Sequence, residues 1–321
     1  MSRLNSGGGR LRLPGPDLGL ELCGIRLAHP VINGSGTFDA IAARRAFGEQ
    51  LGERFPFSMF VSKTITPEPR AGNPPPRLYE TPSGMVNSIG LPNKGLEGFL
   101  LDDLPELARL EVPLCVSVMA PSREGFATLV ERVGRRDEVA AIELNVSCPN
   151  VKSGLIVGEQ PSESRALCEA LRPLTDKPLI VKLTPNCADP AAVAAAAAEG
   201  GADAVSLINT LRATGLDPAT LRPWLGAGSG GLSGPAVRPI ALDQVRRVAA
   251  AVEIPVIGMG GIESGADALA FLAEGASAIA VGTASFRDPL AADRIRAELA
   301  GELAERGLER LPPVPLASTS T

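Results

Sequence analysis

One cysteine in the sequence has neighbours that suit it for acid–base chemistry. Cys148 lies in the stretch Asn145-Val146-Ser147-Cys148-Pro149-Asn150, directly after an apolar run. A thiol has an ordinary pKa of about 8.5, close to working pH, so it can accept a proton from a substrate. Covalent catalysis is the alternative, but the sequence shows no neighbouring base that would activate a nucleophile. We therefore expect Cys148 to act as a general base.

Other catalytic chemistries need residues that this sequence does not provide. His29 is the one histidine, which excludes Ser-His-Asp and Cys-His catalysis by a distant pair and multi-histidine metal sites. It precedes Pro30 at an apolar run, so we expect a structural role for it. The five cysteines form no C-x-x-C pair, which argues against zinc or an iron–sulfur cluster and predicts no metal site. Their odd, sparse distribution favours a reducing, cytoplasmic location.

Two lysines interrupt apolar stretches near predicted strand ends. Lys63 stands in Val-Ser-Lys-Thr and Lys182 in Ile-Val-Lys-Leu-Thr. A lysine in such a place needs an anion or an electron-rich ring as its partner, whereas ordinary lysines lie on solvated surfaces. Neutral amides add donors and acceptors that suit a planar, amide-rich ligand, and they are Asn87, Asn145, Asn150 and Asn209.

Two glycine-rich turns follow the last two predicted strands, at Gly258-Met259-Gly260-Gly261-Ile262 and Val281-Gly282-Thr283-Ala284-Ser285. Each precedes a helical segment, and the free N–H groups of a first helical turn bind phosphate. Simple tight turns are the structural alternative for either stretch alone. The first stretch is a weak match to the dinucleotide fingerprint, because it lacks the third glycine and a following acidic residue. We expect a phosphate site for a mononucleotide.

Short apolar runs alternate with segments of helical period, which is typical of a parallel sheet covered by helices. Eight such runs occur, at residues 30–32, 59–62, 114–119, 141–144, 179–183, 204–208, 255–258 and 278–281. They predict a (β/α)8 TIM barrel with long loops over its C-terminal mouth, and an open doubly wound sheet is the alternative. Polar residues follow most of these runs, and a barrel brings all such strand ends to one rim.

The chain has enough apolar material for one large domain. Of its 321 residues, 45% are hydrophobic and 21% are charged. We expect flexible tails at 1–16 and 311–321 and a single catalytic domain at 17–310. The long connections 64–113, 149–161 and 211–235 are expected to shape the pocket. The net charge of −5 and the lack of a long apolar segment argue against binding to nucleic acid or membranes.

The order and spacing of several short stretches are more specific than any one of them. They are Asn33-Gly34-Ser35-Gly36-Thr37-Phe38, Lys63-Thr64, Glu68-Pro69-Arg70, Gly72-Asn73-Pro74, Asn87-Ser88-Ile89-Gly90-Leu91-Pro92-Asn93, Asn145 to Lys152, Val181 to Asn186, Ile208-Asn209-Thr210, Gly230 to Pro235, and the two glycine-rich turns. Together they make residues from about 18 to 289 resemble the dihydroorotate dehydrogenases.

This resemblance implies an FMN-binding barrel that oxidises (S)-dihydroorotate to orotate in de novo pyrimidine biosynthesis. The implied cofactor contacts are Ser35, Gly36, Lys63, Thr64, Asn145, Lys182, Ile208, Gly234, Gly260, Gly261, Gly282 and Thr283. The implied substrate contacts are Lys63, Asn87, Gly90, Leu91, Asn145, Asn150, Asn209 and Thr210. Cys148 would remove the proton from C5 while C6 delivers hydride to flavin N5.

With a cysteine at position 148, the sequence resembles the soluble class 1 enzymes of the family. The stretch Cys-Pro-Asn-Val-Lys-Ser-Gly makes it more similar to the NAD-linked class 1B catalytic subunit than to the fumarate-linked class 1A enzyme. The resemblance implies a homodimer bound to two copies of an electron-transfer subunit that carries FAD and a [2Fe-2S] cluster, a heterotetramer that passes electrons to NAD. Two stretches, Asp39-Ala40 and Arg212-Ala213-Thr214-Gly215, depart from the family pattern.

Three other functions are compatible with the same residues. One is a flavin dehydrogenase of another dihydropyrimidine, since an amide-rich pocket could accommodate it. The second is a phosphate-binding barrel lyase or isomerase without flavin. The third is a noncatalytic barrel that serves in assembly, with Cys148 idle.

Overall fold

Eight short strands form the central sheet of the computed structural model, which describes residues 15–48, 55–147 and 157–311. The strands are β3 (Val31–Asn33), β4 (Phe60–Val61), β7 (Leu114–Val118), β8 (Val139–Asn145), β9 (Leu179–Lys182), β10 (Ala204–Leu207), β13 (Val256–Met259) and β14 (Ala278–Val281). Each strand overlaps one of the eight predicted apolar runs. The predicted strands are therefore confirmed.

The strands follow one another around the sheet in the order β3-β14-β13-β10-β9-β8-β7-β4, and all the pairs are parallel. The two end strands, β3 and β4, lie next to each other, so the sheet is a nearly closed barrel. This confirms the predicted TIM-barrel fold over the open sheet. The carboxyl ends of the strands meet at one rim, which we call the mouth.

Between β3 and β4 a side chain replaces the backbone ladder. The amide of Asn33, fully buried, accepts a hydrogen bond from the Val61 N–H (2.7 Å) and donates one to the Val61 carbonyl (2.8 Å). One backbone hydrogen bond, from the Ser58 N–H just before β4 to the Val31 carbonyl of β3 (3.0 Å), spans the same seam. The Asn33 amide has the donor and the acceptor of a peptide group, so it closes the barrel at this seam.

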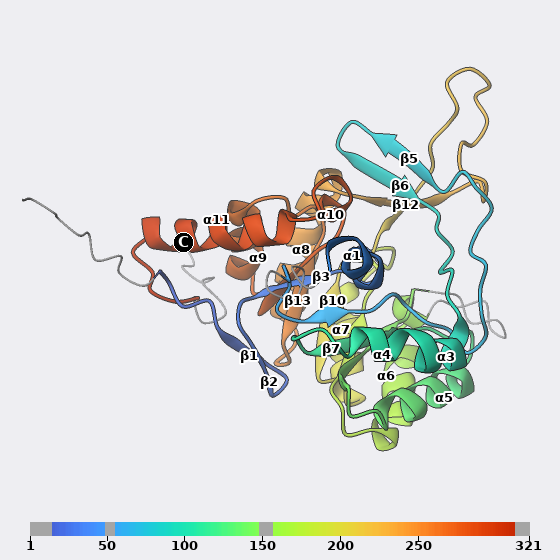
Figure 1. Cartoon of the computed structure of the whole chain (residues 1–321), viewed down its shortest axis with the longest axis horizontal. Coiled ribbons are helices and arrows are strands. Elements are labelled where there is room, and N and C mark those ends of the chain that lie inside the picture. The colour runs from blue at the N-terminus through green and yellow to red at the C-terminus, as the bar shows by residue number, and fades with distance from the viewer. Residues whose placement is uncertain (1–14, 49–54, 148–156, 312–321) are drawn as a thin grey trace, which may run out of the picture.

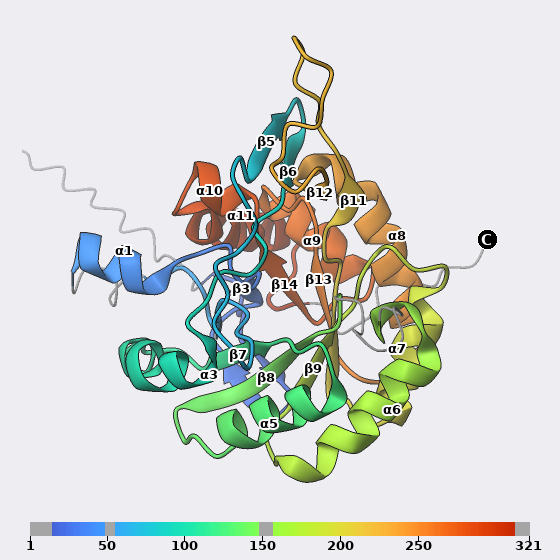
Figure 2. The same ribbon diagram turned by 90° about the vertical axis from the view of Figure 1, so that its right-hand side faces the viewer.

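Helices cover the outside of the barrel (Figure 2). They are α5 (Arg123–Gly134), α6 (Pro161–Leu171), α7 (Pro190–Glu199), α8 (Arg238–Ala249), α9 (Gly265–Ala273) and α11 (Ala291–Glu305). Side-chain caps fix where several of them begin, with Ser122 capping α5, Asp189 capping α7 and Ser264 capping α9. Their buried faces form one hydrophobic layer with the outer faces of the strands.

A second apolar cluster fills the barrel interior toward its amino-terminal end. It contains Ile32, Val61, Ile180 and Ile257 from four of the strands. The hairpin of β1 (Leu20–Leu22) and β2 (Ile25–Leu27) adds two buried leucines to this cluster. The amino-terminal end is therefore closed by side chains, which leaves the mouth as the end where a ligand can enter.

The two longest connections form a small sheet rather than irregular loops, which corrects the prediction for 64–113 and 211–235. Its strands are β5 (Leu78–Thr81), β6 (Gly84–Asn87), β11 (Leu211–Ala213) and β12 (Gly230–Ser233), paired antiparallel in the order β11-β12-β6-β5. Figure 1 labels β5, β6 and β12, and Figure 2 labels all four strands. The connection 64–113 then turns helical, in α3 (Gly95–Gly98), the π-helical turn Phe99–Asp103 and α4 (Leu104–Leu107). The shorter helices α1 (Ala40–Phe47) and α10 (Ala284–Arg287) follow β3 and β14.

The histidine has the structural role that the sequence predicts. His29 is buried, and its Nδ1 accepts a hydrogen bond from the Val31 N–H (3.3 Å). Burial, and then the charge of Arg296, lower the pKa of the imidazole to about 4. His29 is therefore neutral near pH 7 and acts as a hydrogen-bond acceptor beside the seam.

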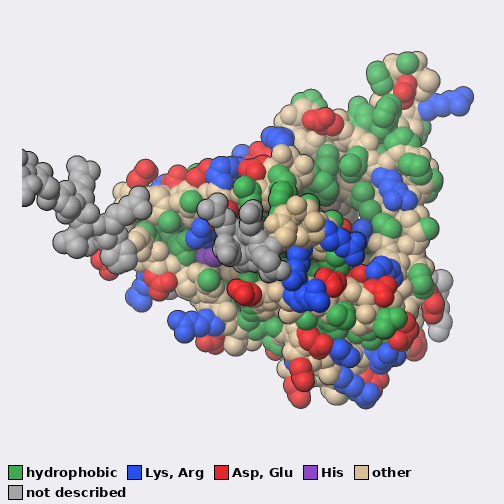
Figure 3. Space-filling model, viewed as in Figure 1, with side chains coloured by type: hydrophobic (Ala, Val, Ile, Leu, Met, Phe, Trp, Pro, Cys, Tyr) green, Lys and Arg blue, Asp and Glu red, His purple; other side chains and the backbone are tan. Residues whose placement is uncertain are grey.

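Acidic and basic side chains are interspersed on the surface. On the face in Figure 3, acidic and basic side chains alternate over the helices, so no extended field of one sign covers it. Within the described ranges, no helix is both long enough and apolar enough to cross a bilayer.

The seam gives a direct test of barrel closure. Replacing Asn33 with alanine leaves the Val61 N–H and carbonyl buried without partners, so we expect the free energy of unfolding to fall by about 3 kcal/mol. Urea unfolding followed by circular dichroism measures this change. Ser58→Ala removes a hydroxyl that donates to the His29 carbonyl across the same seam and should cost about 1 kcal/mol. Equal losses for the two variants would contradict a special role for the Asn33 amide.

Candidate active site

A cavity at the mouth brings together most of the residues that the sequence predicts for a ligand site. Its walls come from the ends of the barrel strands and from the small sheet above them. The predicted residues that line it are Ser35, Gly36, Lys63, Thr64, Asn87, Leu91, Asn145, Lys182, Ile208, Asn209, Thr210, Gly234, Gly260, Gly261, Gly282 and Thr283. Gly90 is not among the lining residues, although its neighbours Ile89 and Leu91 are. Cys148 and Asn150 lie outside the described residues.

The two predicted lysines differ in their surroundings. Lys182, on β9, is 5% exposed, and its Nζ donates to Ser35 Oγ (3.0 Å). Among the described residues no carboxylate pairs with it, so its ammonium group keeps capacity for further acceptors in the cavity. Lys63 also lines the cavity, but it is an exposed residue rather than a buried one. The buried amine of Lys182 suits a ligand that presents oxygen or nitrogen lone pairs.

Amide side chains on three elements line the same cavity. Asn145, at the end of β8, is buried, and its Nδ2 donates to Thr64 Oγ1 (3.3 Å). Asn209, just beyond β10, donates from Nδ2 to Ser147 Oγ (2.6 Å). Asn87, on β6, donates to the Gly231 carbonyl of β12 (3.2 Å) and so also holds the small sheet together. The amides are therefore fixed in place and retain donors for a ligand.

The glycine-rich turns present backbone donors to the cavity. The N–H groups of Gly261, Gly282 and Thr283 donate to no acceptor in the described part of the chain. Gly261 has φ of +75°, and a Cβ there would lie 2.7 Å from the Gly234 carbonyl oxygen, so a larger residue would displace the backbone. Thr283 Oγ1 donates to Ser233 Oγ (2.8 Å), which ties this turn to β12. Such convergent N–H groups suit an anion such as a phosphate.

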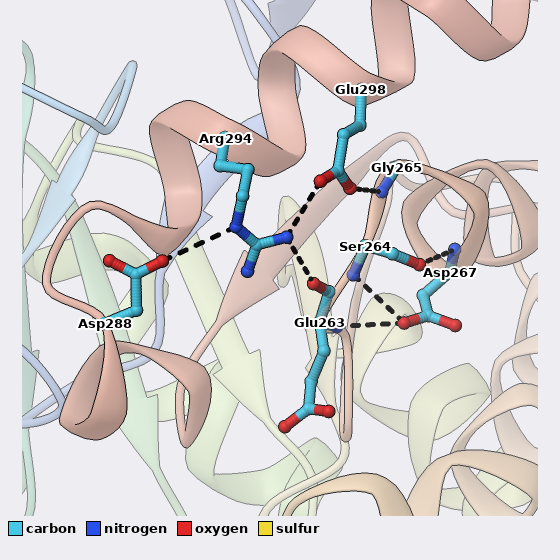
Figure 4. Close-up of polar contacts among 7 residues, drawn as sticks. All are labelled: Glu263, Ser264, Gly265, Asp267, Asp288, Arg294 and Glu298. Atoms are coloured by element: carbon cyan, nitrogen blue, oxygen red, sulfur yellow. Dashed lines mark hydrogen bonds and ion pairs between the residues drawn. The ribbon is translucent and has the colours of Figure 1, made fainter.

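The first turn of α9 is not available for phosphate, which corrects one part of the prediction. Ser264 Oγ accepts from the Asp267 N–H (3.1 Å), and the Asp267 carboxylate accepts from the N–H groups of Glu263 and Ser264 (both 3.0 Å). Glu298 of α11 accepts from the Gly265 N–H (2.8 Å) and is held by Arg294 (2.9 Å), as Figure 4 shows. Carboxylates of the protein occupy this helix terminus, so an anion would have to use the turns themselves.

Several lining residues carry no signal that sequence reasoning detected. Leu78 and Met85 belong to the hairpin of β5 and β6, and Phe286 belongs to α10. The dipeptide Pro82-Ser83, which connects the two strands, is typical of a turn and could have indicated a hairpin. Glu143, within the predicted strand 141–144, is a buried carboxylate two residues before Asn145. With Asn145 on the same face of the strand, its position in the alternation could have placed it inside the barrel.

The thiols of the described residues are not suited to accept a proton at neutral pH. Cys115 lies inside the barrel, and burial, with the nearby Glu143, raises its pKa well above the ordinary value. Burial also raises the pKa of Cys187, which donates to the Thr184 carbonyl (3.4 Å).

Comparison with known proteins shows one family throughout. The family model described as dihydroorotate dehydrogenase matches residues 17–303. A protein of Geobacter sulfurreducens named dihydroorotate dehydrogenase B (NAD(+)), catalytic subunit, is 46% identical over 297 residues, which cover 91% of this chain and 95% of that protein. A protein of the same name from Desulforudis audaxviator is 46% identical over 293 residues, covering 90% and 93%.

Anion binding by the glycine-rich turn after β14 can be tested by adding one negative charge to it. Gly282→Asp would place a carboxylate beside the N–H groups of the turn. We expect it to lower the affinity for FMN, the cofactor that the sequence resemblance implies, at least about tenfold, as measured by fluorescence quenching. A Cβ at Gly282 meets nothing closer than Thr37 Cγ2 at 3.5 Å, so the fold should tolerate the change. The matched control is Gly301→Asp on α11, where a Cβ meets nothing. Equal affinity in both variants would refute an anion site at this turn.

Proposed function

Because the chain belongs to the dihydroorotate dehydrogenase family, we propose that it oxidises (S)-dihydroorotate to orotate at the mouth of the barrel, with FMN as its cofactor, in pyrimidine biosynthesis. One observation carries the proposal. A single cavity combines a buried amine, fixed amides and backbone N–H groups that have no acceptor among the described residues. A flat ring rich in carbonyl groups, joined to a phosphate, is the kind of ligand that this donor set fits.

FMN fits the residues that the structure describes. The N–H groups of Gly261, Gly282 and Thr283 would hold its phosphate. Ser35, Gly36, Lys63, Thr64, Asn145 and Lys182 would surround its ring, with Ile208, Gly234 and Gly260 completing the walls. Lys182 would contribute a positive charge that the ring carbonyl and nitrogen lone pairs can satisfy. Bound FMN would supply a two-electron acceptor for hydride.

The substrate would bind against this ring among the amides. We assign its contacts to Lys63, Asn87, Gly90, Leu91, Asn145, Asn150, Asn209 and Thr210. The amides would orient the ring of dihydroorotate, and Lys63, whose side chain stays exposed at the rim, is suited to its carboxylate. Cys148, three residues beyond Asn145, is assigned as the base that takes the proton from C5.

The electron acceptor is assigned from the relatives. Their names describe an NAD(+)-linked catalytic subunit, so we propose that this chain forms a homodimer that passes electrons to NAD through a partner subunit. FAD and a [2Fe-2S] cluster would belong to that partner, since this chain has no cysteine pair at cluster spacing. The sparse cysteines also support a cytoplasmic location.

Anaerobic mixing of the FMN-loaded protein with candidate substrates tests the reaction. Dihydroorotate should bleach the yellow flavin absorbance, while dihydrouracil, which lacks the carboxylate, should not. Bleaching by dihydrouracil alone would select a dehydrogenase of another dihydropyrimidine. A protein that takes up no FMN would contradict flavin chemistry altogether.

The base is tested by removing its thiol. Cys148→Ala should keep FMN bound but slow flavin reduction by dihydroorotate at least about a hundredfold, the scale of general-base catalysis. Stopped-flow absorbance measures the rate. Cys187→Ala is the matched control, because Cys187 follows the neighbouring strand β9 and its thiol donates a hydrogen bond to the Thr184 carbonyl. Unchanged kinetics in Cys148→Ala would eliminate the assigned role.

A further inference from the structure

A carboxylate lies buried inside the barrel near the mouth. Glu143 of β8 is 3% exposed, and its oxygens accept hydrogen bonds from Ser117 Oγ of β7 (2.9 Å) and Ser206 Oγ of β10 (3.3 Å). Because β9 lies between β8 and β10, the bond to Ser206 crosses the barrel interior. Burial of a carboxylate costs free energy that an apolar residue would not, so this position calls for an explanation.

From Glu143 a chain of hydrogen bonds runs toward the cavity. Ser117 gives its one hydroxyl proton to Glu143, so in the contact between Ser117 Oγ and Thr64 Oγ1 (2.9 Å) the donor is Thr64. Thr64 Oγ1 in turn accepts from Asn145 Nδ2 (3.3 Å). A carboxylate only accepts, so it sets the direction of every bond up to Asn145.

The other end of the chain sets the same direction independently. The Thr210 N–H donates to Asn209 Oδ1 (2.9 Å), which leaves Asn209 Nδ2 to donate to Ser147 Oγ (2.6 Å). Ser147 Oγ then donates to Asn145 Oδ1 (2.9 Å). A backbone N–H only donates, so donors at Asn209 and an acceptor at Glu143 fix one polarity along the whole chain.

We propose that Glu143 is a positioning residue that fixes the orientation of the Asn145 and Asn209 amides toward the ligand. The proposal deepens the function proposed above and rests on it for the identity of the ligand. Asn145 Oδ1 already accepts from the Ser147 N–H (3.4 Å) and hydroxyl, so Asn145 offers the ligand one N–H and no acceptor. The ligand atom beside Asn145 must therefore be an acceptor, such as a carbonyl or carboxylate oxygen.

The continuity of the chain can be measured without any ligand. Ser117→Ala interrupts the series of hydrogen bonds. Ser206→Ala removes the other hydroxyl from the same carboxylate and leaves that series intact. Both serines are fully buried, so the two variants are matched. Each is combined with Ser147→Ala, and the midpoint of urea unfolding is recorded.

In this comparison Ser147→Ala should shift the midpoint at least about a fifth less in the Ser117→Ala background than in the unmodified protein, because bonds in a chain strengthen one another. In the Ser206→Ala background its shift should be unchanged. Ser117 and Ser147 make no hydrogen bond to each other, so any coupling between them must pass through the hydrogen-bond chain. Equal midpoint shifts for Ser147→Ala in the Ser117→Ala and Ser206→Ala backgrounds would contradict a continuous hydrogen-bond chain.

Binding of orotate to the FMN-loaded protein tests what the chain does. Ser117→Ala and Glu143→Gln should weaken binding about tenfold, the effect of one misplaced hydrogen bond, and Ser206→Ala less than about threefold. Glu143→Asp keeps an acceptor-only group and should bind more tightly than Glu143→Gln. A packing role predicts the opposite order, because glutamine has nearly the shape of glutamate.

The two proposals fail in different ways. If the unfolding coupling is present but the unmodified protein binds no orotate, the proposed function is wrong and the positioning role of Glu143 stands. If orotate binds the unmodified protein and all four variants equally, or the glutamine variant more tightly than the aspartate variant, the positioning role is wrong and the proposed function is untouched.

Discussion

The arrangement of the site depends on how the barrel closes between β3 and β4. Elsewhere in the described sheet, backbone ladders join neighbouring strands, but at this seam the Asn33 amide bonds both the N–H and the carbonyl of Val61. The residues that follow Asn33 line the cavity, and Ser35 accepts from Lys182 on β9, across the barrel. The segment that closes the barrel therefore also sets the distance across its mouth.

Much of the barrel could be predicted because its strands are short apolar runs separated by helical segments. Both faces of a strand such as β7 are buried, so the signal is a continuous run that local sequence contains. The small sheet lacked such a signal. Its strands have three or four residues, β12 begins with two glycines, and β12 pairs with β6 from more than a hundred residues away. No local pattern encodes a pairing of that separation, so both segments resembled loops.

The candidate site was predictable where residues directly follow strands, since the carboxyl ends of parallel strands in a barrel share a rim. That geometry brings Lys182, Asn145 and Asn209 to one cavity. The prediction for α9 failed for one local and one tertiary reason. Ser264 and Asp267 form a capping box, whose spacing the sequence does contain. Glu298 comes from α11, and no local pattern indicates that this distant carboxylate accepts from the Gly265 N–H. Glu143 was missed because it lies within the predicted run 141–144, whose other residues are apolar.

The two ends of the cavity solve the problem of ligand recognition by different means. At the turns after β13 and β14 the donors are backbone N–H groups, whose polarity is fixed by the chain itself. Beside Lys182 the donors are amides, which can rotate by half a turn and exchange donor for acceptor at little steric cost. A group of fixed polarity must therefore determine which end of each amide donates and which accepts. The Thr210 N–H and the Glu143 carboxylate provide one at each end of a continuous series of hydrogen bonds, which gives a reason for a carboxylate buried beside the apolar cluster of the barrel interior.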